Sequence, residues 1–288
     1  MEKTNRKRIA ITGGRGRLAP RLAAHLRGIG HDVVLFSRTS DGEFLDVSSL
    51  ELAGGLEGFD AVLHLAWSTV PLLAEESPGI EERQDFPFAR ALIAAASQNA
   101  PSPKLVFFST AAVYGDTGSH AATEETPCLP LGRYAAGKLA GEKLFLSYAN
   151  ACVLRITNVF GAGCPLTRPQ GIIPVLLQAA RDGSEVAIWG DGSAEKDYLA
   201  ANDLHQAVAA VLEADLRGVF NVSSAHSLSV NELVLLVEKA SKLAIRRRFV
   251  APYPWDVNVA HVSSDKLRNA TGWRPRLTPR EAVQAILS

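Results

Sequence analysis

The sequence predicts an α/β protein, built on a doubly wound parallel sheet with a smaller C-terminal α/β lobe. In the first half of the chain, short apolar runs alternate with longer amphipathic stretches, a pattern typical of repeated βαβ units around a parallel sheet. The length, 288 residues, is near the size at which a single hydrophobic core stops growing. We therefore expect two unequal lobes.

The individual elements follow from hydrophobic periodicity. Five apolar runs are expected to be strands: residues 8–12, 32–37, 61–65, 104–109 and 152–156. Ala, Leu and Phe recur at helical spacing in three crossover helices and a closing helix: residues 17–27, 85–99, 132–148 and about 278–287. Beyond Asn158, glycines and prolines crowd one stretch: Gly161, Gly163, Pro165, Pro169, Gly171 and Pro174. Regular structure is expected to pause there, where a loop-rich lobe begins.

Composition narrows the class of partner. The chain has 30 basic and 30 acidic side chains, so its zero net charge favours a small-molecule partner over nucleic acid or a membrane surface. Cys128, Cys152 and Cys164 are odd in number and lack metal-ligand spacing, which indicates reduced thiols and predicts no metal site. The charged N-terminus does not resemble a signal peptide, and no apolar run is long enough to span a membrane. We expect a cytoplasmic protein.

A glycine-rich turn follows the first expected strand. Gly13, Gly14, Arg15, Gly16, Arg17 and Leu18 lead into Ala19, and Gly14-x-Gly16-x-x-Ala19 fits the dinucleotide fingerprint in its strand–turn–helix context. Glycines let the backbone approach a pyrophosphate, and the N-terminus of the next helix offers free N–H groups. The turn predicts a Rossmann-type dinucleotide domain, which we place at residues 1–157 plus about 197–218. Residues 158–196 and 219–288 are then expected to form the substrate-binding lobe.

The end of the second expected strand bears on which dinucleotide binds. An acidic residue here usually accepts hydrogen bonds from the ribose hydroxyls, but the sequence reads Ser37-Arg38. Arg38, helped by Arg15, is suited to neutralise a ribose phosphate, so NADP is favoured over NAD. The alternative for Arg38 is a solvated loop residue. Asp46 and Val47 suit an adenine contact, or Asp46 caps a helix that begins near Ser48.

A tyrosine and a lysine form the expected reacting centre. Tyr134 and Lys138 are four residues apart and therefore share a helix face. A nearby ammonium group is expected to lower the pKa of the phenol toward the working range of a general base. Upstream, Ser109 and Thr110 end an expected strand at the edge where open α/β sheets bind ligands.

These motifs, with their order and spacing, resemble the extended short-chain dehydrogenase/reductases, the NAD-dependent epimerase/dehydratase family that includes UDP-galactose 4-epimerases. The resemblance covers nearly the whole chain through residues 12–19, 60–66, 110–115, 134–138, 155–161, 190–192, 197–198 and 272–275. It implies that Thr110, Tyr134 and Lys138 are catalytic. It also implies that Leu65 and Ala66 line the cofactor groove, and it leaves His64 as a groove residue. Ser109 is expected only to pack.

The resemblance also implies a substrate site, with departures. Asn158 matches a residue that contacts the substrate diphosphate, whereas Lys196 and Tyr253 stand where the family carries arginines. Lysine is a point charge without a bidentate fork, so diphosphate binding should be altered, and residues 246–248 are candidate substitutes or simply a solvated charged edge. Asp85 stands where the family commonly has Asn. The helices beginning near Asp85 and Gly132 are candidates for a homodimer interface.

The reaction expected from the resemblance is hydride transfer at a sugar carbon. Dehydratases of the family carry Asp-Glu after the catalytic Thr, but this chain has Ala111-Ala112, which leaves a sugar-nucleotide epimerase or a 4-ketoreductase. Two alternatives stay open: reduction of a carbonyl compound without a nucleotide, and a non-catalytic NADP sensor. The intact Thr110, Tyr134 and Lys138 speak against a sensor.

Overall fold

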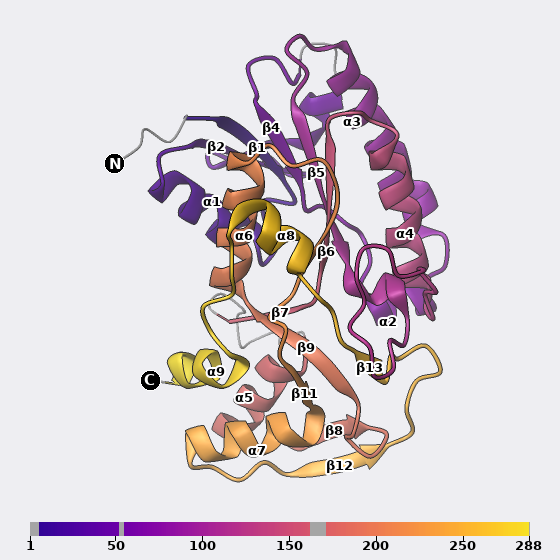
Figure 1. Ribbon diagram of the computed structural model, residues 1–288, viewed down its shortest axis with the longest axis vertical. Helices are drawn as coiled ribbons and strands as arrows, with labels where there is room; N and C mark the ends of the chain where they lie inside the picture. The colour runs from indigo at the N-terminus through magenta and orange to yellow at the C-terminus, as the bar shows by residue number, and fades with distance from the viewer. Residues whose placement is uncertain (1–5, 52–54, 162–170, 288) are drawn as a thin grey trace. The chain divides into compact units, whose positions relative to one another are not determined.

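A computed structural model describes residues 6–51, 55–161 and 171–287 of the chain (Figure 1). The chain divides into two compact units. The first comprises Met1–Thr110, Gly132–Arg155 and Val208–Phe220, and the second comprises Ala111–Leu131, Ile156–Ala207 and Asn221–Ser288. The second unit therefore includes residues 111–131, inside the range expected for the dinucleotide domain. The functional roles of the two lobes stay predictions.

A seven-stranded parallel sheet forms the centre of the first unit. Its strand order is β10-β6-β5-β4-β1-β2-β3. The strands are β1 (Arg8–Thr12), β2 (Asp32–Ser37), β3 (Phe44–Asp46), β4 (Ala61–His64), β5 (Lys104–Thr110), β6 (Ala151–Ile156) and β10 (Gly218–Val222). Because β1 lies between β2 and β4, the direction of winding reverses at β1, where the glycine turn begins. The expected fold class is confirmed.

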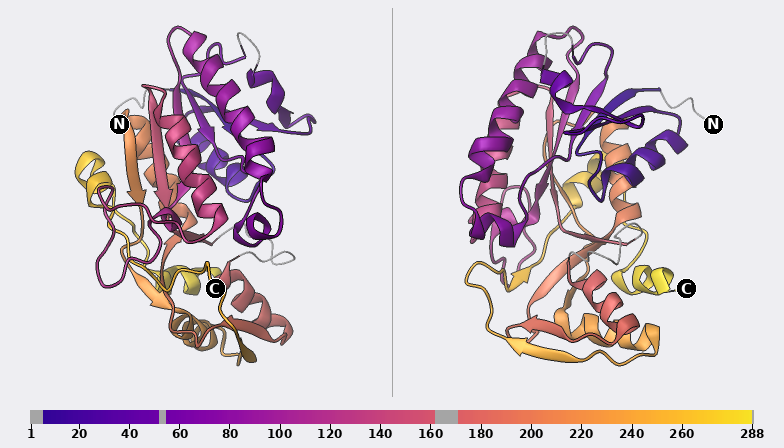
Figure 2. Two further views of the ribbon diagram at one scale, coloured as in Figure 1. Left: turned by 90° about the vertical axis from the view of Figure 1, so that its right-hand side faces the viewer. Right: turned by 180° about the vertical axis from the view of Figure 1, so that it is seen from behind.

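Helices cover both faces of this sheet. They are α1 (Ala19–Gly28), α2 (Pro71–Glu76), α3 (Phe86–Gln98) and α4 (Arg133–Leu146), with short helical turns η1 (Val47–Glu51) and η2 (Glu81–Asp85). α3 and α4 lie side by side on the face opposite α1 (Figures 1 and 2). Phe107 of β5 and Phe145 of α4 are fully buried and stack at a centroid distance of 4.7 Å. This contact fixes α4, which carries Tyr134 and Lys138, against the sheet.

The second unit contains two small sheets and its own core. One sheet has the order β11-β9-β13 with β7 also paired to β9, and the other pairs β12 with β8. The strands are β7 (Asn158–Phe160), β8 (Val186–Trp189), β9 (Glu195–Ala200), β11 (Ser227–Ser229), β12 (Arg247–Val250) and β13 (Val259–Ala260). The helices are η3 (Ala111–Tyr114), α5 (Ile172–Asp182), α7 (Val230–Ser241), α8 (Asp265–Thr271) and α9 (Pro279–Leu287). α6 (Ala201–Glu213) begins in this unit and ends in the first. The core of the second unit includes the buried side chains of Leu176, Ile188, Leu233 and Val283.

The expectation of a loop-rich stretch after Asn158 is wrong for its described part. β7 begins at Asn158, and α5 begins at Ile172 despite Pro174. The first turn of a helix has N–H groups without intrahelical acceptors, so proline there removes no hydrogen bond. Gly163, Cys164, Pro165 and Pro169 lie outside the described residues. Cys152 is buried and Cys128 half-buried. No helix in the described ranges is long and apolar enough to cross a membrane.

Candidate active site

The turn after β1 has room only for glycine. Gly13 has a φ of +74°, and a Cβ there would lie 2.9 Å from the backbone nitrogen of Ala66. A Cβ on Gly14 would lie 3.1 Å from the Phe36 carbonyl oxygen, and one on Gly16 would lie 2.9 Å from the carbonyl oxygen of Gly13. This close backbone packing fits the approach that a dinucleotide pyrophosphate needs, with α1 beginning directly after the turn. The expected groove residue Ala66 lies beside the turn.

Arg15, in the glycine turn between β1 and α1, has an acidic partner. The Arg15 guanidinium forms an ion pair with Asp41 and lies over the Phe44 ring, 4.5 Å from its centroid. In this arrangement its charge is already neutralised by Asp41, so the expected help to Arg38 is not supported. Arg38 itself is exposed, directly after the buried Ser37 at the end of β2.

Asp46 ends β3 and organises the turn that follows. Its carboxylate accepts hydrogen bonds from the backbone nitrogen and the hydroxyl of Ser48, both at 2.9 Å. These bonds lower the pKa of Asp46. The capping interpretation of Asp46 is thus confirmed, with a 3₁₀ turn (η1) in place of a longer helix. Contacts of Asp46 and Val47 with adenine stay predictions.

A buried ion pair supports the end of β5. The Ser109 hydroxyl donates to Glu142 Oε1 at 2.6 Å, and Arg155 donates to the same carboxylate from Nη2 at 2.7 Å. Glu142 and Arg155 have side chains only 1% and 8% exposed. Ser109 therefore has the packing role expected of it. Thr110, the next residue, is only partly buried and ends the strand.

Lys138 brings α4 and the end of β5 together. Its Nζ donates to the Phe108 carbonyl oxygen at 2.8 Å, two residues before Thr110. The same nitrogen lies 4.2 Å from the Trp67 ring centroid and 4.8 Å from that of Phe107. A Lys ammonium over aromatic faces is attracted by their quadrupoles. Lys138 is thus held beside the strand that ends in Thr110.

The electrostatics of Tyr134 differ from the expectation. Burial, and next the carboxylate of Glu81, raise the pKa of Tyr134 to about 12. Burial lowers the pKa of Lys138 to about 7, although Asp85, Glu142 and Glu81 act in the opposite direction. The expected lowering of the phenol pKa by Lys138 is therefore wrong for the protein without cofactor: loss of solvation and a carboxylate outweigh a lysine whose own charge is destabilised.

Asp85 and His64 also have structural partners. Asp85 accepts hydrogen bonds from the backbone nitrogen and the hydroxyl of Ser68 at 3.0 and 2.8 Å. Burial, and next the charge of Lys138, lower the pKa of His64 to about 3. The His64 Nδ1 lies 2.9 Å from the hydroxyl of Thr12. A neutral, buried imidazole fits the expected groove residue better than a catalyst.

The predicted substrate residues lie in the second unit. Asn158 donates from Nδ2 to the Asp197 carbonyl oxygen at 2.9 Å, which ties β7 to β9. Lys196 Nζ lies 2.5 Å from Asp256 Oδ1, with both side chains about one-fifth exposed (21% and 23%). Lys196, one of the two residues that stand where the family carries arginines, is thus already paired with a carboxylate. The sequence alone did not indicate Asp256 as a partner, because it is 60 residues away from Lys196 along the chain.

Tyr253 belongs to an aromatic cluster. Its ring stacks on Trp255 with centroids 4.6 Å apart, and Trp189 meets it edge-on at 4.3 Å. The rings present a partly exposed aromatic surface, since Trp189 is 38% exposed.

The basic run 246–248 is tied to its own edge of the second unit. Arg246 donates to the Gly183 carbonyl oxygen at 2.6 Å, and Arg248 pairs with Glu185 at 3.1 Å. All three arginines are exposed. The structure therefore supports the solvated charged edge and not a substitute diphosphate site.

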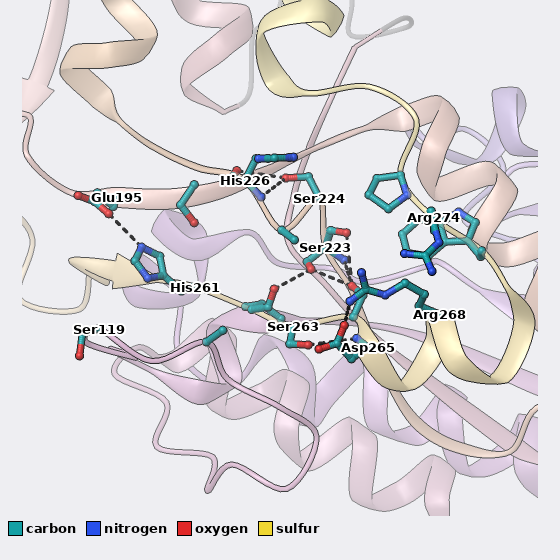
Figure 3. A pocket seen from close by; sticks show the side chains of 17 residues that line it. Ser119, Glu195, Ser223, Ser224, His226, His261, Ser263, Asp265, Arg268 and Arg274 are labelled. Atoms are coloured by element: carbon teal, nitrogen blue, oxygen red, sulfur yellow. Dashed lines mark hydrogen bonds and ion pairs between the residues drawn. The ribbon is translucent and has the colours of Figure 1, made fainter.

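A cavity of about 720 Å³ lies elsewhere in the second unit (Figure 3). A hydrogen-bonded pair, His261 with Glu195, and an ion pair, Arg268 with Asp265, line it. Glu195 and Lys196 are successive residues of β9, so their side chains point to opposite faces of the strand. Asn158, Lys196 and Tyr253 are not among the described residues that line the cavity.

The whole-chain comparisons decide the family. The sequence profile of the NAD dependent epimerase/dehydratase family matches residues 9–223. The chain belongs to this family. A UDP-glucose 4-epimerase of Corynebacterium glutamicum is 29% identical, with 96% of this chain and 93% of the relative aligned. MoeE5, solved in complex with UDP-glucose and NAD, is similar in structure with a TM-score of 0.88, 26% identity and 97% of each chain covered.

The family also includes relatives with a different reaction. A dTDP-glucose 4,6-dehydratase of Streptomyces niveus is 28% identical over 76% of this chain and 66% of its own length. The family resemblance of the sequence is therefore confirmed. Membership of the family does not by itself distinguish epimerisation, reduction and dehydration; the residues of the site must do so.

Proposed function

We propose that this family member transfers a hydride between nicotinamide and a carbon of a nucleotide-sugar, with Tyr134 as the proton donor and acceptor. The observation that carries the proposal is the hydrogen bond from Lys138 to Phe108, which joins the helix of Tyr134 to the strand that ends in Thr110. A bound nicotinamide dinucleotide would supply or accept the hydride. The glycine turn and Ala66 would hold its pyrophosphate end.

The chain's own residues would handle the proton and the oxygen. In the reductive direction Tyr134 donates its phenol proton to the carbonyl oxygen as the hydride reaches the carbon, which turns a ketone into an alcohol. Thr110 would hold that oxygen. Oxidation reverses both transfers. The raised pKa of Tyr134 favours the protonated phenol, so it supports the reductive direction in particular.

Dehydration is disfavoured by the residues after Thr110. Ala111 and Ala112 have methyl side chains, which cannot transfer the protons that elimination of water requires. Epimerisation, the activity named for the Corynebacterium relative, needs only oxidation followed by reduction on the opposite face. An epimerase or a 4-ketoreductase is therefore the function that the site supports best.

The cofactor and substrate classes follow from two local features. We infer NADP from the Ser37-Arg38 strand end, which offers a cation and no carboxylate to the ribose, although MoeE5 was solved with NAD. We infer a nucleotide-sugar substrate because MoeE5 was solved with UDP-glucose. In this chain, Asn158, Lys196 and Tyr253 would lie near the nucleotide of such a substrate. A homodimer through α3 and α4 stays a prediction.

The test is product analysis with UDP-glucose and either oxidised cofactor. Wild-type protein is expected to yield an epimer or a keto-sugar, and Tyr134→Phe is expected to abolish turnover while it still binds cofactor. Tyr148→Phe is the matched control, because the Tyr148 hydroxyl donates to the Pro103 carbonyl oxygen at 2.8 Å and should not affect the reaction. Full activity of Tyr134→Phe would refute the catalytic assignment. Cofactor binding without turnover of any keto- or nucleotide-sugar would favour a sensor.

A further inference from the structure

Glu81 is a buried carboxylate without a role in the reaction described so far. Its side chain belongs to η2, the π-helical turn that leads into α3, and the residue is only 5% exposed. The hydroxyl of Thr69, also buried, donates to Glu81 Oε1 at 2.5 Å. Burial of a carboxylate away from water is costly unless it has polar partners, and Thr69 supplies one.

The carboxylate lies against the helix that carries the reacting pair. A Cβ on Gly137 would lie 3.3 Å from both Glu81 Cγ and Glu81 Oε1. Gly137 is three residues after Tyr134, so the two share a face of α4. The absence of a side chain at Gly137 is what lets the carboxylate approach this face. α3, which continues from η2, runs beside α4 (Figures 1 and 2).

We propose that Glu81 is a positioning residue for Tyr134: its charge beside this face of α4 disfavours the phenolate, so that Tyr134 is set to donate its proton. This inference rests on the proposed function and gives it a direction, reduction of a keto group. A negative charge near a phenol disfavours the phenolate, and near an ammonium it favours the protonated form.

Other charges around the pair do not replace this effect. Asp85, on the same turn as Glu81, is engaged by Ser68, and it acts on Lys138. Glu142 of α4 pairs with Arg155 of β6, and it also acts on Lys138 but not on the Tyr134 phenol.

His64, which lies near Lys138, does not replace this effect either. His64 of β4 has a pKa lowered to about 3 and is neutral in the working range. After burial, Glu81 is the carboxylate that raises the pKa of the Tyr134 phenol, and with Asp85 and Glu142 it opposes the lowering of the Lys138 pKa.

The experiment is a phenolate absorbance titration of the full-length protein without cofactor or substrate. The chain has 5 tyrosines, so each spectrum is corrected by that of the same protein carrying Tyr134→Phe. Glu81→Gln keeps the size of the side chain and removes its charge. We expect Tyr134 phenolate to appear at a pH lower than in wild type by on the order of one unit, the effect of removing one charge from partly buried surroundings.

Two controls separate charge from structure. Glu82→Gln makes the same change at the next residue, which is exposed, and should titrate as wild type does. Glu81→Asp keeps the charge and should also stay close to wild type. If Glu81→Gln does not fold, Glu81→Met removes the same charge with a side chain suited to burial, and the same shift is expected of it.

The outcomes are distinct. The proposal is overturned if Tyr134 phenolate appears at the same pH in wild type and in Glu81→Gln. It is also overturned if the midpoint of the Tyr134 titration in wild type is below the ordinary pKa of 10.0. If both charge-removed variants fail to fold, that wild-type midpoint decides. Where turnover is found, Glu81→Gln should also move the pH profile of hydride transfer to lower pH. Turnover by Tyr134→Phe would refute the proposed function, yet the titration would still test Glu81.

Discussion

The substitution Gly13→Ala tests the cofactor turn most sharply. Gly13 has a φ of +74°, a conformation that costs an L-residue about 1–2 kcal/mol. The added Cβ would also lie 2.9 Å from the backbone nitrogen of Ala66 and 3.0 Å from its Cα. Backbone atoms cannot swing aside as a side-chain end can, so the turn or the end of β4 must move. We expect a total cost of at least about 2 kcal/mol at the turn.

The measurement is titration calorimetry with NADPH and NADH. If this cost is lost from the free energy of cofactor binding, the dissociation constant of the cofactor rises by more than about tenfold. Gly28→Ala is the matched control, because Gly28 lies in α1 and a Cβ there would meet nothing within 4 Å. The control should bind cofactor as wild type does and gain up to about 1 kcal/mol of stability. A wild-type dissociation constant for Gly13→Ala would refute the reasoning.

Three further predictions follow from other contacts. Glu142→Met should lower the free energy of unfolding by about 3–5 kcal/mol, because it leaves Arg155 buried and unpaired. In denaturant titrations, the double variant with Arg155→Met should recover part of that loss. Equal losses in the single and the double variant would contradict this prediction. Arg38→Ala should weaken NADPH binding by roughly tenfold and leave NADH binding unchanged, whereas equal effects would exclude a phosphate contact. Asp256→Asn should free Lys196 and tighten the binding of UDP by roughly threefold to tenfold in calorimetry; unchanged or weaker binding would show that Lys196 does not meet the diphosphate.

Much of the fold follows from local sequence. β1 and β2 coincide with the expected runs 8–12 and 32–37, and α3 and α4 differ from expectation by one or two residues at each end. The two strands are short apolar runs, and α3 has an apolar face. α5 was missed because its first turn contains a proline, which reads as a breaker unless the N-terminus of the helix is known.

The site was less accessible to sequence reasoning. The order of residues indicated Tyr134 and Lys138, but not that Glu81, 53 residues earlier, would be the charge that acts on the phenol. Loss of solvation at the partly buried Tyr134 is likewise a property of the packed site, so its pKa moved in the opposite direction from the one expected. The pairing of Arg15 with Asp41 also depends on a loop conformation that periodicity does not specify.

Isotope transfer tests the central claim most directly. Reduced cofactor deuterated at nicotinamide C4 is incubated with a nucleotide-linked keto-sugar, and the sugar product is analysed by mass spectrometry. We predict one deuterium on the new carbinol carbon with wild-type protein and none above background with Tyr134→Phe, although both bind the cofactor. Equal deuterium incorporation by the two proteins would contradict the account.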